Sequence, residues 1–131
     1  NAQKLMDVTE KALNVGISVA QAGNTVGDIG YAIEKYVKKN NFVVVEELGG
    51  HGVGYHQHED PHIANYGTRG EGKKLVPGMV LALEPIVNEG TRFIKLLSDE
   101  YTFVTKDHKR SAHFEHTILI TEGQPEILTK I

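Results

Sequence analysis

The sequence contains no cysteine, which excludes disulfide bonds, thiolate metal ligands and a cysteine nucleophile. A bound metal ion would therefore need His, Asp and Glu ligands, a donor set that suits Mn, Fe, Co or Zn. No apolar run is long enough to span a bilayer, and the longest lies in GMVLALEPIV. Neither charge dominates, since 14 Lys and Arg against 17 Asp and Glu give a formal net charge of -3. This balance gives no indication of binding to nucleic acid or to an anionic membrane.

The 131 residues fit a single domain, to which we assign the whole range 1–131. No signal peptide is visible, and the expected location is the cytoplasm. The chain opens NAQKLMDVTEKAL, without an initiator methionine and with a pattern that is already helical. This opening predicts a fragment of a longer protein or a processed product.

Two amphipathic segments come first, over about residues 2–23 and 24–41. Their apolar residues recur at helical spacing, at Leu5, Val8, Ala12 and Val15 in the first and at Ile29, Ile33 and Val37 in the second. Asn24 and Thr25 are candidate helix caps, and Asp28 falls in the first turn of the second helix. We expect the two helices to form an antiparallel pair.

The rest of the chain has the short β-branched and alternating runs that are typical of strands. We predict a strand at 42–47, a loop through about residue 72, a buried strand within 75–87, a hairpin over 92–107, a strand at 111–121 and a short last strand at 125–130. The turn of the hairpin is expected near Asp99. The predicted fold is α+β, with two helices followed by a curved, mostly antiparallel sheet.

The predicted loop carries four histidines among glycines, in GGHGVGYHQHEDPHIANYG. His51 lies between glycines that let the backbone approach a neighbour closely, and we favour it as a metal ligand. His58 is a candidate second ligand or a donor to a substrate oxygen. A histidine in a loop is more often a solvated surface residue, and we assign His56 and His62 to that class.

Glu84 and Glu115 each interrupt an apolar strand, in MVLALEPIV and in HFEHTILIT. An ionised carboxylate in a buried strand is costly unless it is compensated. For a single glutamate, an edge position or a salt bridge to lysine would be enough. Two of them, in a chain that also has a histidine-rich loop, point to a metal ion. His113, close to Glu115, could act beside the ligands.

Other chemistries fit less well. GHGVG and GTRGEG are rich in glycine but lack the strand and helix that flank a nucleotide-binding loop. No Gly-x-Ser-x-Gly motif of a serine hydrolase is present. A glycoside hydrolase with Glu84 and Glu115 as acid and base remains open, although it would leave the histidines unexplained.

Three segments, GHGVGYHQHEDPHIANYG, LVPGMVLALEPIV and SAHFEHTILITEGQPEILT, together resemble the C-terminal part of type I methionine aminopeptidase in their order and spacing. The resemblance covers essentially the whole chain. It implies the pita-bread fold, an α+β arrangement of two related halves around a curved antiparallel sheet. It also implies a hydrolase that removes the N-terminal methionine from new polypeptides.

The resemblance further implies a centre of two divalent metal ions with five protein ligands. His51 matches the histidine ligand, Glu84 a glutamate ligand, and Glu115 the glutamate that bridges both ions. Glu84 is in addition the candidate proton shuttle in metal-assisted hydrolysis. His58 matches a histidine that contacts the substrate and stabilises the tetrahedral intermediate.

Two further substrate-binding residues follow from the resemblance. Tyr101 falls where the family has an aromatic residue in the methionine pocket. Gln57 falls where a large apolar pocket residue is common, so this chain departs from the pattern there. His113 is a candidate for its position close to Glu115 and not from the resemblance: from beside the ligands it could touch the substrate or tune a ligand.

The two aspartate ligands of the family lie upstream of its helical pair, and neither Asp7 nor Asp28 matches them. The chain would therefore keep one metal site of weakened affinity, with His51, Glu84 and Glu115 as its ligands. The expected partners are the missing N-terminal half or a second copy of the chain, because a half-fold would expose apolar surface.

Two other readings of the same fold remain. One is a non-catalytic pita-bread module that binds proteins, which has no physical need for buried carboxylates. The other is an X-Pro peptidase or a creatinase-like hydrolase. The spacing from GHGVG to HEDP and the short hairpin fit the methionine enzyme better.

Overall fold

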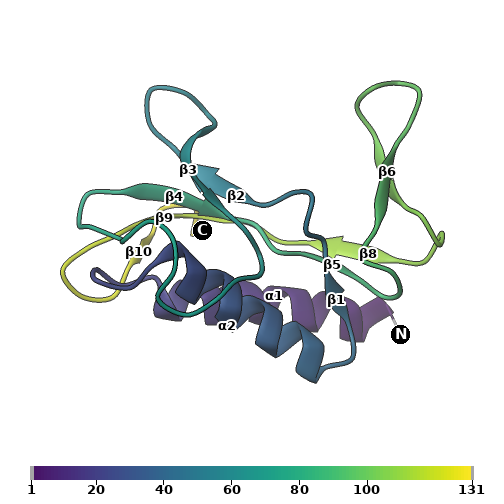
Figure 1. Cartoon of the computed structure of the whole chain (residues 1–131), viewed down its shortest axis with the longest axis horizontal. Helices are drawn as coiled ribbons and strands as arrows, with labels where there is room; N and C mark the ends of the chain where they lie inside the picture. Colours follow the sequence, from purple (N-terminus) through teal and green to yellow (C-terminus); the bar gives the residue numbers. More distant parts are fainter. Residues whose placement is uncertain (1, 131) are drawn as a thin grey trace.

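The computed structural model describes residues 2–130 as two helices followed by ten short strands. The helices lie side by side against one face of the sheet, as Figure 1 shows. From the other face rise the loop between β2 and β3 and the hairpin of β6 and β7 (Figure 1). The predicted α+β class, and the order of two helices before an antiparallel sheet, are confirmed.

Helix α1 spans Ala2–Val19 and helix α2 spans Val26–Lys39. Thr25 caps α2 through a capping box: its hydroxyl accepts a hydrogen bond from the Asp28 N–H, and the Asp28 carboxylate accepts one from the Thr25 N–H. The predicted apolar stripe of α2 is buried as expected. In α1, Val15 is only half-buried, because Leu13 and Ile17 share the core-facing side with the other predicted residues.

The strands pair antiparallel in three sheets, in the orders β1-β5-β8, β10-β9-β4-β2-β3 and β6-β7. Their bounds are Val43–Val44 (β1), Gly50–Gly52 (β2), Glu59–Ile63 (β3), Val80–Leu83 (β4), Ile86–Asn88 (β5), Ile94–Leu96 (β6), Phe103–Thr105 (β7), Ser111–His113 (β8), His116–Leu119 (β9) and Glu126–Ile127 (β10). The predicted hairpin and last strand are therefore present. In residues 2–130, neither helix is long and apolar enough to cross a membrane.

Two segments that we expected to be single strands are each interrupted. The first breaks at Glu84–Pro85, between β4 and β5, and the second at Phe114–Glu115, between β8 and β9. Pro85 has no N–H to donate to a neighbouring strand, which explains the first break. The register is the same on both sides, since Leu83 pairs with His116 and Ile86 with His113. Glu84 therefore stands opposite Glu115.

The predicted loop over residues 49–72 is wrong in its first half, which contains β2 and β3. Glycine usually weakens a strand, so the glycine-rich sequence of β2 gave no indication that it pairs with β3 and β4. Here the missing side chains are required: a Cβ on Gly50 would overlap the carbonyl oxygen of Ala82 in β4, and one on Gly52 would overlap that of Asp60 in β3. His51 is thus held on a strand inside the five-stranded sheet, paired with Ala82 on one side and His62 on the other.

The core lies between the helices and the sheet. Its fully buried side chains come from both layers and include Leu5, Leu13, Ile29, Ile33, Ile63, Leu81, Leu83 and Ile118. Burial of such side chains stabilises each by roughly 1.5–3 kcal/mol relative to exposure. The side of the sheet away from the helices is left free to carry polar groups.

Candidate metal centre

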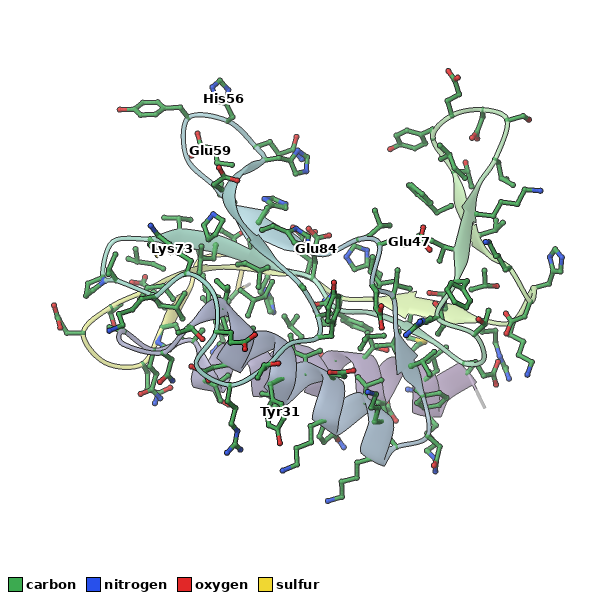
Figure 2. All side chains as sticks on the ribbon, viewed as in Figure 1. Tyr31, Glu47, His56, Glu59, Lys73 and Glu84 are labelled. Carbon is green, nitrogen blue, oxygen red and sulfur yellow. The ribbon has the colours of Figure 1, made fainter. Side chains whose placement is uncertain are left out.

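Three potential metal ligands meet at the breaks in the sheet. His51 comes from β2, Glu84 from the break between β4 and β5, and Glu115 from the break between β8 and β9. One ligand atom from each of them lies within 4.8 Å of the others. The structure thus brings together residues that are separated by up to 64 positions in the sequence (51 to 115). Figure 2 labels Glu84 in the region between the two projections of the sheet.

His51 is oriented by its own backbone neighbour. Its Nδ1 lies 2.9 Å from the carbonyl oxygen of Gly52, which can only accept, so Nδ1 carries the hydrogen. In the neutral ring, Nε2 then presents a lone pair toward Glu84, whose Oε1 is 3.2 Å away. A lone pair facing a carboxylate oxygen repels it unless a proton or a cation lies between them. A histidine that donates its other N–H to a backbone carbonyl is the usual arrangement for a metal ligand, so these residues fit a metal ion.

The two glutamates differ in their exposure. The side chain of Glu84 is 15% exposed, close to the 14% of His51. Glu115 is exposed, which corrects the expectation that both carboxylates lie in buried strands. The difference arises because Glu84 is in an inner strand segment, flanked by neighbours on both sides, whereas β8 is at the edge of its sheet. The ligand cluster is therefore open toward Glu115.

His113 contacts the second oxygen of Glu84. Its Nε2 is 3.1 Å from Glu84 Oε2, so two histidines flank one carboxylate. The hydrogen bond to Glu84 raises the pKa of the His113 imidazole above its ordinary value, against an opposing effect of burial. The predicted position of His113 beside the ligands agrees with this contact.

His58 lies at the end of the loop that joins β2 and β3, next to His51. Their ring centroids are 4.3 Å apart in an edge-on arrangement. His58 and His51 both line a cavity of about 470 Å³. Because His58 is exposed, its ring can reach a molecule bound in this cavity without first breaking a buried contact.

The cavity has a polar end and apolar walls. The polar end consists of His51, His58, Glu84 and His113. The apolar walls come from the segment after β1 and from the strands β5, β6 and β7, through Val45, Leu48, Ile86, Ile94, Phe103 and Val104. Sequence reasoning missed these wall residues. The alternating pattern of the hairpin predicted its strands, but not which side of each strand would face the site.

Gln57 and Tyr101 do not line this cavity in residues 2–130. Gln57 is exposed, and Tyr101 is 86% exposed near the turn of the β6–β7 hairpin. His56 and His62 are also exposed, in agreement with their assignment to the surface. Figure 2 places His56 at the tip of the β2–β3 loop, directed away from the sheet.

Comparison with known proteins identifies a family and close relatives. The model of metallopeptidase family M24 matches residues 1–122. Methionine aminopeptidase 1 from Bacillus subtilis is 50% identical over 129 residues, which cover 98% of this chain and 52% of the relative. The chain thus spans about half the length of the curated relatives it matches.

Solved structures give the same picture. A methionine aminopeptidase from Thermotoga maritima superposes with a TM-score of 0.96 at 46% identity, covering 98% of this chain and 52% of that one. The enzyme from Rickettsia prowazekii has the same TM-score and coverage at 42% identity. A prolidase from Pyrococcus furiosus matches with a TM-score of 0.70 at 23% identity over 98% of this chain and 32% of that one, a likeness of fold alone. The expected pita-bread fold is confirmed.

Proposed function

This chain belongs to metallopeptidase family M24, and from this premise we propose that it serves the metal-dependent removal of N-terminal methionine from new polypeptides. The observation that carries the proposal is the convergence of His51, Glu84 and Glu115 at the polar end of an apolar cavity. Relatives that share 39–50% of its residues bear the name methionine aminopeptidase. New polypeptides are made in the cytoplasm, which is therefore the proposed location.

Use of a divalent metal ion is supported by the family and by the geometry of the three residues. We assign His51 Nε2 and the carboxylates of Glu84 and Glu115 as its ligands. Imidazole and carboxylate donors suit Mn, Fe, Co and Zn, and three protein ligands leave open positions, as in catalytic sites. When bound, the ion supplies Lewis acidity, which withdraws electron density from the oxygen atoms that it contacts. We propose one such ion in this chain and two in the complete enzyme.

Glu84 has the strongest claim to move a proton. Its Oε2 already accepts from His113 and its Oε1 faces His51, so the carboxylate is held in place for transfer between a water molecule and the leaving amine. His58, at the exposed rim, is placed to donate to the oxygen on which negative charge develops. His113 holds Glu84 in its orientation.

The apolar walls of the cavity would bind the methionine side chain. The cavity volume of about 470 Å³ is ample for one unbranched side chain. Ile94 and Phe103 from the hairpin would contact the methionine side chain. Phe103 is 46% exposed, so a bound side chain would remove apolar surface from water. The roles that we expected for Gln57 and Tyr101 then require the hairpin and the β2–β3 loop to close over the substrate.

The open side of the ligand cluster is proposed to receive a second polypeptide segment. Glu115 is exposed there, and the relatives are about twice as long as this chain. The segment would be the N-terminal half of a longer protein or a second copy of the chain, and it would bring further carboxylates. Apolar side chains on the hairpin, such as Phe93 and Leu96, which are 47% and 45% exposed, would be partly covered by it.

Metal titration by calorimetry, with Mn(II) under anaerobic conditions, tests the ligand assignment. We expect one ion per chain, and we expect Glu115→Ala to weaken its binding by at least about 10-fold because a charged ligand is lost. Glu122→Ala is the matched control, since it removes another exposed carboxylate, in the bend between β9 and β10. Equal affinity of Glu115→Ala and wild type would show that the ligand assignment is wrong.

A peptide panel tests the reaction. The chain, alone and mixed with the N-terminal half of a relative, is incubated with peptides that begin with Met, with Leu or with X-Pro. We expect cleavage only of the peptides that begin with Met, and only by the mixture of the two halves. Cleavage of X-Pro peptides would favour the prolidase reading, and metal binding without any hydrolysis in the mixture would favour a binding module.

A further inference from the structure

Asn65 is a buried polar residue that touches the metal centre through the backbone. It follows the end of β3, is 1% exposed, and donates from Nδ2 to the carbonyl oxygen of Glu84 at 3.2 Å. The two residues are 19 positions apart in the sequence. A buried amide side chain is costly unless its hydrogen bonds are made. The role of Asn65 is therefore to be found in its partner, the backbone of Glu84.

The bond lies where the backbone of the neighbouring strand offers no hydrogen bond to the carbonyl oxygen of Glu84. On one side, Pro85 pairs with Phe114, whose N–H donates to the Pro85 carbonyl oxygen at 3.4 Å. Successive residues of a strand direct their backbone groups to opposite sides, so the groups of Glu84 point away from Phe114, toward β1 and β2. Donors from that side reach the residues around Glu84: Val53 bonds the carbonyl of Val80, and Val45 bonds that of Ile86.

Between β1 and β2 the neighbouring chain leaves the ladder. β1 ends at Val44 and β2 begins at Gly50. The register of β1 against β5 is shifted relative to the register of β2 against β4. The intervening residues therefore cannot keep regular strand pairing opposite Glu84. The side chain of Asn65 takes the place of the strand N–H that a regular sheet would offer to the Glu84 carbonyl.

We propose that Asn65 is a positioning residue for Glu84, an inference that rests on the proposed metal site. Outside the ladders, three constraints fix Glu84: the ring of Pro85 restricts its conformation, Asn65 holds its carbonyl, and His113 holds its carboxylate. Loss of the Asn65 bond frees the peptide between Glu84 and Pro85 to rotate. The carboxylate then no longer stays between the two histidines.

Asn65 is itself held firmly. Ile63, two residues before it, pairs with Gly50 at the end of β3. Ala64 and Tyr66, on either side of it, have their carbonyl groups pressed against Gly30 of α2, where a Cβ would overlap them. The segment that carries Asn65 is thus fixed by its packing against helix α2.

Asn88 provides a matched control in the same chain. It is also an asparagine, it is fully buried at 0% exposed, and its Nδ2 donates to a backbone carbonyl, that of Thr91, at 2.9 Å. It lies at the far end of β5 from Glu84. Asn65→Leu and Asn88→Leu keep the side-chain shape and remove one such bond each, so Asn88→Leu controls for the replacement of a buried asparagine by an apolar side chain.

The test measures both variants and wild type by Mn(II) titration and, without metal, by amide hydrogen exchange. We expect Asn65→Leu to weaken Mn(II) binding on the order of 10-fold and to speed the exchange of the Phe114 amide, which donates across the break. Asn88→Leu should leave both values near those of wild type. Equal changes in the two variants, or none in Asn65→Leu, would overturn the proposal. If wild type itself bound no Mn(II), the proposed metal site would fail, and the exchange of Phe114 would still decide the role of Asn65.

Discussion

Gly30 in α2 offers the sharpest test of how the helices support the site. A methyl group there would lie 2.7 Å from the carbonyl oxygen of Ala64 and closer still to that of Tyr66. Both are backbone atoms of the segment that carries Asn65, so no side chain can rotate to make room. The substitution Gly30→Ala must move either α2 or this segment.

Two opposing effects set the magnitude. Alanine in place of glycine inside a helix gains about 1 kcal/mol of stability. Overpacking costs about 1–3 kcal/mol, and we take the upper end because the obstacle is backbone. The net prediction is a destabilisation of about 2 kcal/mol, which lowers Tm by about 8 °C for a chain of this size.

Urea unfolding followed by circular dichroism measures the change. Gly123→Ala is the control, because a Cβ there would meet no heavy atom within 4 Å and the residue has no positive φ, and we expect it to leave stability unchanged. Mn(II) affinity should fall as well in Gly30→Ala, since the displaced segment holds Glu84 through Asn65. A Gly30→Ala variant at least as stable as wild type would refute the packing of α2 against residues 64–66.

Two further predictions concern charge. The N–H of Thr25, which donates to the Asp28 carboxylate, holds the pKa of Asp28 below its ordinary value of 3.8. A lowered pKa stabilises the fold above the ordinary value, and the benefit disappears as the pH falls from that value through the lowered pKa. Asp28→Ala should therefore lose about 1 kcal/mol of stability near pH 7, with a smaller difference from wild type near pH 3, measured by urea unfolding. The Arg110 guanidinium holds the pKa of Glu89 to about 2, so Arg110→Leu should return it toward 4.5, which an NMR titration would detect. An unchanged Glu89 pKa would contradict this pairing.

Local signals predicted the helices well. The capping residue Thr25 and the first-turn Asp28 act within three residues of each other, and the apolar stripe of α2 depends only on helical spacing. The hairpin was predicted for the same reason, since its two strands are neighbours in the sequence. Such features need no information from distant parts of the chain.

The strands around the site were harder to predict. β2 has the sequence Gly-His-Gly, which has low strand propensity and becomes a strand only because β4 and β3 approach it closely on both sides. Likewise, the breaks at Glu84 and Phe114 depend on one proline and on its pairing with a strand about thirty residues away. Pro85 is visible in the sequence, but the propensity of a short window does not contain the pairing that sets β2 or the break at Phe114.

The kinds of side chain available for chemistry follow from the sequence alone. With no cysteine, any metal site had to use His, Asp or Glu, and the motifs around His51, Glu84 and Glu115 were enough to indicate the family. The register between distant strands places Glu84 opposite Glu115, leaves Tyr101 outside the cavity, and brings Asn65 to the carbonyl oxygen of Glu84. The physical reason is that side-chain direction in a sheet depends on register and on where pairing stops, and both are set between strands that are distant in the sequence.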